Sequence, residues 1–85
     1  MERRLAIDFR SSEPSYKQLS DQLRDAITSG EIGPGEALPS LAAMVTETAL
    51  SMSTVQRAVK VLVEDGLVVT VPGRGIYAAS PPNES

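Results

Sequence analysis

The side chains best able to recognise another molecule gather between residues 51 and 60. They include hydroxyl, thioether, amide and cationic groups: Ser51, Met52, Ser53, Thr54, Gln56, Arg57 and Lys60. Hydroxyls beside the backbone N–H groups of a helix N-terminus can hold a phosphate. The Gln56 amide can bond an adenine bidentately, and Met52 or Ala42 could touch a thymine methyl. This is the chemistry of nucleic-acid recognition, although Gln56 and Lys60 could also be the solvated face of a helix.

A second candidate is Arg74, which stands between Gly73 and Gly75 in a stretch that predicts a turn. Glycine has no side chain to block a phosphate, so the backbone can approach DNA closely. A lone guanidinium can enter a minor groove. The alternative is an ordinary exposed arginine in a turn.

The composition argues against catalysis. The 85 residues include neither cysteine nor histidine, which excludes disulfides, thiolate metal sites, His-based triads and His-ligated metals. No phosphate-binding glycine loop precedes a helix. We expect no enzyme, no cofactor and no metal. No apolar run approaches the ~18 residues needed to span a membrane, and we expect a cytoplasmic protein.

The middle of the chain predicts two helices joined by a tight turn. Ser40 can cap a first helix whose pattern of apolar residues breaks at residues 46–48. Ser51 or Ser53 can cap a second helix that runs to about Asp65, before a glycine stop signal. Such a pair can be a helix-turn-helix, whose second helix lies in a DNA major groove, or an ordinary helical hairpin.

The flanking segments supply the other elements. Residues 15–29 predict a helix, after Pro14, with apolar residues three or four apart along one face. Residues 31–36 form a turn-rich connector. Residues 67–71 and 76–78 predict two strands of a β-hairpin around the turn at 72–75. The expected fold is mainly α with a small β-hairpin: a winged helix-turn-helix of three helices and a two-stranded wing.

The termini lie outside this unit. Residues 5–9 alternate in polarity and predict a short strand or an extended arm. Ahead of them, Arg3 and Arg4 could reach a phosphate or minor groove, or could belong to a solvated terminus. We therefore expect an N-terminal arm at 1–13, a DNA-binding domain at 14–78 and a tail or linker at 79–85.

The motifs resemble the DNA-binding domain of the GntR family of bacterial transcription regulators. They stand in family order and near-family spacing: Pro14-Ser15-Tyr16-Lys17-Gln18-Leu19, Pro34-Gly35, Leu38-Pro39-Ser40, Ser51, Ser53-Thr54-Val55, Ala58, Leu62, Gly66-Leu67-Val68 and Gly73-Arg74-Gly75. The Pro-x-Tyr-x-Gln opening resembles the HutC and YtrA branches more than the FadR branch. The resemblance implies a sequence-specific DNA-binding regulator, acting as a repressor on double-stranded operator DNA. The second helix of the pair would read the major groove and the wing the minor groove.

The sequence departs from the family at three positions that commonly hold DNA-contacting arginines. Here they are Ala42, Met52 and Gln56. Each such contact is worth ~1–3 kcal/mol, so we expect altered sequence preference and weaker binding. The DNA-binding set that remains is Ser40, Ser51, Met52, Ser53, Thr54, Gln56, Arg57, Lys60, Gly73, Arg74 and Gly75.

Two further expectations concern partners. Because one module contacts few base pairs, we expect a homodimer, with any effector ligand bound by a domain outside this chain. The net charge of −3 and the missing arginines also motivate an alternative, a winged-helix protein-interaction module with reduced or lost DNA readout. We expect an aliphatic core that includes Tyr16, Leu23, Val55, Val59 and Leu62, without a site role.

Overall fold

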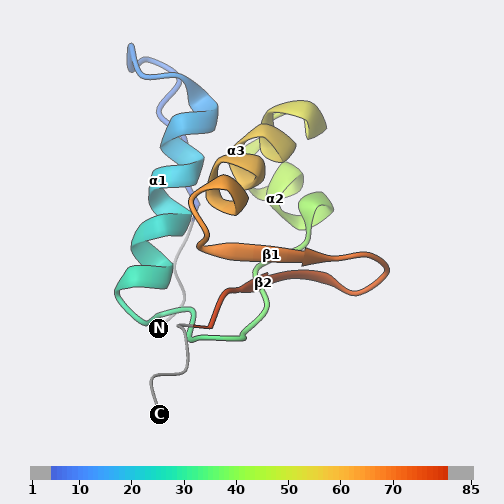
Figure 1. The fold of residues 1–85 in the computed structure, drawn as a ribbon. Coiled ribbons are helices and arrows are strands. Elements are labelled where there is room, and N and C mark those ends of the chain that lie inside the picture. The colour runs from blue at the N-terminus through green and yellow to red at the C-terminus, as the bar shows by residue number, and fades with distance from the viewer. Residues whose placement is uncertain (1–4, 81–85) are drawn as a thin grey trace.

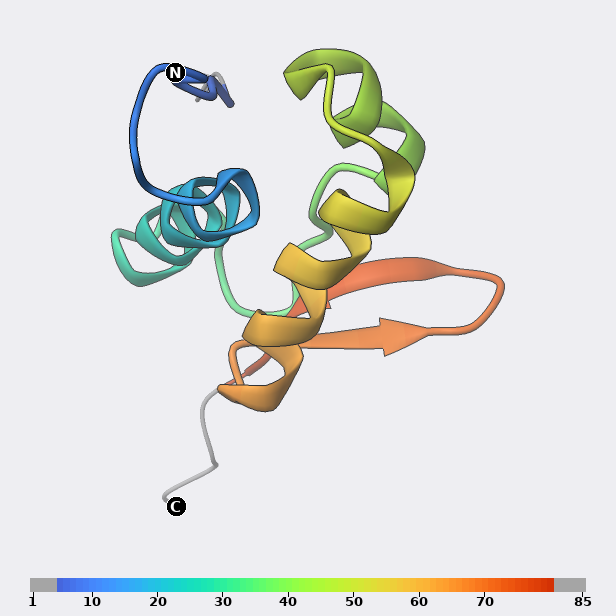
Figure 2. The same cartoon turned by 90° about the horizontal axis from the view of Figure 1, so that it is seen from above.

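The protein's structure, a computed structural model, describes residues 5–80. Its elements follow in the order α1 (Ser15–Thr28), α2 (Leu41–Thr48), α3 (Met52–Glu64), β1 (Val68–Val71) and β2 (Gly75–Ala78). Helix α3 lies between α1 and α2, and the hairpin of β1 and β2 projects on the side away from α1 (Figures 1 and 2). The predicted winged helix-turn-helix is confirmed.

Helix α1 forms where apolar residues recur every three or four positions, because this spacing places them on one face. Leu19, Leu23 and Ala26 of that face are buried. The helix begins after Pro14, whose φ of −58° suits the entry into a helix. The predicted end at residue 29 is one residue too late, since Ser29 already serves as the C-cap.

Two serines start the next two helices, as predicted. The Ser40 hydroxyl accepts a hydrogen bond from the Ala43 N–H at 3.1 Å, and Ser51 does the same for Thr54 at 3.2 Å. Each bond satisfies a backbone donor that has no partner within the helix. Of the two alternatives for α3, Ser51 is therefore the cap and Ser53 lies inside the helix.

The apolar pattern breaks at residues 46–48, and α2 ends at Thr48. The Thr48 hydroxyl donates to the Met44 carbonyl at 2.7 Å and accepts from the Leu50 N–H at 3.2 Å. This buried hydroxyl ties the last turn of α2 to the link that follows. The chain then reverses at Ala49, which adopts a left-handed φ of 61°.

The wing is an antiparallel pair in which Val68 faces Ala78 and Val71 faces Gly75. Each predicted strand differs from the observed one by one residue, at its first position. Leu67 precedes β1, whereas Gly75 belongs to β2 because it pairs with Val71. The predicted hairpin is otherwise confirmed.

The chain between the turn-rich connector and α2, residues 36–38, pairs with the wing. The Leu38 N–H donates to the Ile76 carbonyl at 2.8 Å, and the Ala78 N–H donates to the Glu36 carbonyl at 2.8 Å. A bridge also joins Ala37 to Tyr77. This short segment therefore pairs with β2 and anchors the base of the wing, a role that its turn-rich composition did not indicate.

The N-terminal segment is the predicted extended arm, without strand structure over residues 5–9. Two glutamines of α1 bind alternate residues of the arm, since Gln22 exchanges hydrogen bonds with Ala6 and Gln18 does so with Asp8. The arm also reaches α2, where the Leu5 N–H donates to the Glu47 carboxylate at 2.9 Å. Arg3 and Arg4 lie outside the described residues.

The core is aliphatic, as the composition indicates. It joins the three helices and the wing through fully buried side chains: Leu19, Leu23, Met44, Val55, Leu62 and Val68. Val59 is also buried, as predicted. Tyr16 is the exception, because it is only half-buried and packs at the edge of the core.

Candidate nucleic-acid interface

The exposed face of α3 carries the predicted reading residues. Ser53, Gln56, Arg57 and Lys60 are exposed, as is Met52 with 42% of its surface accessible. Steps of three and four bring these residues onto one side of the helix, opposite the buried Val55. Nothing within residues 5–80 covers this face, which is therefore available to a partner.

The hydroxyl groups at the start of α3 already contact one another. Ser51 Oγ lies 3.2 Å from Ser53 Oγ and 2.9 Å from the hydroxyl of Thr54, which is half-buried. Ser51 thus has a structural role in starting α3, as Ser40 does for α2. Both capping serines are exposed. The N-termini of α2 and α3, which carry partial positive charge, therefore lie at the surface.

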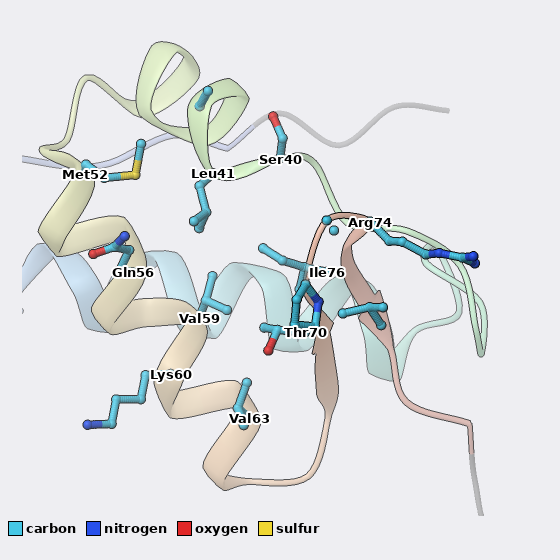
Figure 3. Close-up of a pocket in the computed structure, with 15 residues that line it drawn as sticks. Ser40, Leu41, Met52, Gln56, Val59, Lys60, Val63, Thr70, Arg74 and Ile76 are labelled. Carbon is cyan, nitrogen blue, oxygen red and sulfur yellow. The ribbon is translucent and has the colours of Figure 1, made fainter.

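The tip of the wing is a tight turn in which the Arg74 N–H donates to the Val71 carbonyl at 2.9 Å. Gly73 and Gly75 have φ values of 74° and 135°, which residues with a side chain rarely adopt. The glycines thus serve the turn itself, whatever else they allow. The exposed Arg74 side chain extends away from α3, so it does not converge with Gln56 or Lys60 (Figure 3).

Between α3 and the wing runs an open groove of about 820 Å³. Lys60 and Gln56 stand along its α3 side, and Thr70 and Ile76 line the wing side (Figure 3). Its walls are mostly apolar. The sequence did not indicate this groove, because it forms only where α3 packs beside the wing; Val71 in its wall is 37% exposed.

Arg57 makes a contact that sequence reasoning also missed. Its guanidinium carbon lies 3.9 Å from the centre of the Tyr16 ring, across the interface between α1 and α3. Tyr16 thus packs against the core, as expected, and in addition contacts an exposed cation. The two residues are far apart in the sequence, and only the packing of α1 against α3 brings them together.

The cations of the protein differ in their pairing. Lys17 and Arg24 of α1 bind carboxylates, and the hydrogen bond and charge of Asp21, with Glu13, raise the pKa of Lys17 above its ordinary value. By contrast, Arg57, Lys60 and Arg74 form no ion pair with any carboxylate among residues 5–80. Among residues 5–80, the unpaired cations are therefore these three and Arg10 of the N-terminal arm, although the whole chain is acidic.

Two negative findings complete the description. Within residues 5–80, no group of three or more acidic, cysteine or histidine side chains could hold a metal ion. In the same part of the chain, no helix has the length and hydropathy to cross a membrane.

Comparisons with known proteins agree with this geometry. Residues 15–78 match the model of the family described as bacterial regulatory proteins, gntR family. The HTH-type transcriptional repressor YtrA of Bacillus subtilis is 37% identical over 73 residues, which cover 86% of this chain and 56% of that protein. The chain spans 14–59% of the length of the curated relatives that it matches.

Solved structures share the fold. YtrA from Sulfolobus acidocaldarius, a GntR-family transcription factor, aligns with a TM-score of 0.83 and 36% identity, over 92% of this chain and 82% of that chain. AraR(DBD) in complex with operator ORE1 aligns with a TM-score of 0.78 and 26% identity, over 86% of this chain and 89% of that chain.

Proposed function

Because the chain belongs to the GntR family of bacterial regulatory proteins, we propose that it is a repressor that binds a specific operator. Helix α3 enters the major groove, and the wing contacts the adjoining minor groove. The similarity to a protein solved on its operator and to a transcriptional repressor supports this proposal. The observation that carries it is the exposed face of α3, whose cations form no ion pair with a carboxylate of residues 5–80.

The residues of this face divide by chemistry. Gln56 and Met52 can reach base edges, since an amide can bond adenine and an apolar group can touch a thymine methyl. Lys60 and Arg57 are suited to phosphates, which fix the register of the helix on the duplex. The hydroxyls of Ser53 and Thr54 add phosphate contacts at the helix N-terminus.

Three further parts of the proposed interface come from outside the reading face. Ser40 and Ser51 hold the N-termini of α2 and α3 toward the duplex by capping them. The turn of Gly73 and Gly75 brings the wing backbone close to DNA. Arg74, which extends from that turn, enters the minor groove.

The chain is organised for this task as one reading unit with two flanks. We assign residues 14–78 to the DNA-binding domain, 1–13 to an arm and 79–85 to a tail or linker. Two copies bind a two-fold operator, because one module covers few base pairs. An effector, where one acts, binds a domain outside this chain, and the regulator works in the cytoplasm.

The test is selection of binding sites by the 85-residue chain from a random duplex library, followed by fluorescence anisotropy. The proposal expects one enriched sequence that binds at least about a hundredfold tighter than a scrambled duplex of equal composition. Equal binding to the enriched and scrambled duplexes would contradict it. The double variant R57A/R74A serves as the control, and it should bind both duplexes more weakly, because Arg57 is assigned to a phosphate.

The apolar groove favours one second candidate, a winged-helix module that binds a protein. Its mostly apolar lining and the exposed Met52 and Val71 fit a protein partner better than a phosphate backbone. This candidate requires a stoichiometric partner in co-purification, together with cellular function that survives R57A/R74A. Loss of function in that variant would favour the DNA-binding proposal.

A further inference from the structure

Tyr16 and Arg57 form a contact between two helices at the edge of the proposed DNA-binding face. The guanidinium carbon of Arg57 lies 3.9 Å from the centre of the Tyr16 ring, well within the range of a cation–π interaction. Tyr16 is half-buried in the first turn of α1, whereas Arg57 is exposed in the first half of α3. The ring therefore presents one face to a cation that remains accessible from outside.

The core fixes the position of the ring relative to the arginine. Leu19, one turn after Tyr16, is fully buried. On α3, the neighbours Val55 and Ala58 on either side of Gln56 and Arg57 are also fully buried. Since both helices are anchored so close to the contact, the ring provides a rigid platform for an otherwise flexible side chain.

Stacking leaves the hydrogen-bonding edge of the guanidinium available. Its five N–H donors lie in the plane of the group, so a ring against one face does not occupy them. Among residues 5–80, no carboxylate forms an ion pair with Arg57, whereas Lys17, beside Tyr16 in the sequence, binds Asp21 at 3.1 Å. The Tyr16 ring thus holds one face of the Arg57 guanidinium, and the N–H groups along its edge remain free to bind a partner.

We propose that Tyr16 is a positioning residue for Arg57, whose stacked guanidinium binds a phosphate on the α1 side of α3. A flexible exposed arginine loses side-chain freedom when it binds, and a side chain already held in place loses less. The stack therefore favours DNA binding without Tyr16 itself touching DNA. This inference rests on the proposed function.

The experiment compares DNA affinities of Tyr16 and Arg57 variants on the selected duplex. Y16F retains the ring and should bind like the unmodified protein. Y16L retains apolar bulk but lacks the ring, and its Kd should rise about three- to tenfold. In the R57A background, Y16L should cause no further loss, because the residue through which Tyr16 acts is absent.

Lys60 provides the matched control. It is an exposed cation three residues further along α3, in the same depression as Arg57, and it lies on no aromatic ring of the described chain. In the K60A background, Y16L should therefore have its full effect. Thermal unfolding of each variant shows whether Y16L weakens binding merely by destabilising α1.

Three results of the affinity measurements would overturn the inference. The first is an undiminished Y16L effect in the R57A background. The second is Y16F as weak as Y16L, which would assign the effect to the hydroxyl group. The third is unchanged affinity of a folded Y16L.

A measurement without DNA separates this inference from the proposed function. The Tyr16 ring should shift the NMR resonances of the Arg57 side chain upfield in the free protein, and Y16L should abolish that shift. An intact ring-current shift in a protein without operator preference would refute the proposed function while leaving the stack in place. Absence of the shift, with normal operator preference, would refute the positioning role alone.

Discussion

Neighbouring side chains on α3 differ in whether their contacts with a duplex depend on its base sequence. An amide such as Gln56 presents both a donor and an acceptor, so it can distinguish one base pair from another. A lysine such as Lys60 only neutralises a phosphate, which is the same beside every base. Substitutions at the two positions should therefore have different signatures.

At the residue scale, we expect Q56A to relax sequence preference at one position of the operator. The loss should be ~1–3 kcal/mol for the preferred base pair and close to zero for its competitors, because only the amide reads that base. K60A should weaken binding to all duplexes alike and lower the slope of log K against log salt by about 0.9. Anisotropy titrations with single-base operator variants, repeated across salt concentrations, separate the two. The reverse assignment of effects would contradict these roles.

Arg74 should act through groove width. A narrow A·T-rich minor groove attracts a single guanidinium, whereas G·C-rich flanks do not offer the same potential. We expect R74A to bind operators with A·T flanks more weakly and operators with G·C flanks almost unchanged. Equal losses on both flanks, measured by competition, would indicate a plain phosphate contact instead.

At the element scale, Ala49 sets the direction of the chain between the end of α2 and the start of α3. Its φ of 61° is strained for a residue with a Cβ, whereas glycine adopts this conformation readily. We expect A49G to raise the free energy of unfolding by ~0.5–1 kcal/mol. The same substitution in the first turn of α2, A43G, should instead lower it, because glycine is less favourable than alanine at a helical position. Urea denaturation gives both values, and a destabilising A49G would contradict the argument.

The fold could be predicted from local patterns because its elements depend mostly on neighbouring residues. The stripe of α1, the serine caps and the hairpin around Gly73 and Gly75 follow from spacing and turn chemistry. The left-handed Ala49 and the pairing of residues 36–38 with β2 could not be predicted, because no residue type in those segments requires them. The Tyr16–Arg57 stack likewise depends on how α1 packs against α3. The proposed reading residues are exposed as expected, but their contacts with DNA remain a prediction.

At the scale of the whole molecule, the acidic net charge opposes general attraction to DNA. We therefore expect binding to depend on local cations, above all on Arg57, Lys60 and Arg74 of α3 and the wing. With two or three phosphates neutralised per copy, the salt slope should be about −2 to −3 for each bound copy. A much steeper slope would show that other cations, outside this face, carry the binding.

The proposed pairing of two copies has a geometric consequence. Two modules on one face of B-DNA need half-sites whose centres lie about 10 base pairs, or a multiple of that, apart. We expect the selected operator to be an inverted repeat with such spacing. Inserting five base pairs between the half-sites should reduce affinity sharply, whereas inserting ten should restore much of it. Indifference to both insertions would contradict a two-fold complex.

The most direct test of the DNA-binding face is an NMR titration of the protein with its selected duplex. Our account predicts that the largest amide shifts fall at residues 51–60 and 73–75, with little change on the carboxylate-paired face of α1 around Lys17 and Asp21. Shifts centred on α1, or a wing and α3 that do not respond to the duplex, would contradict it.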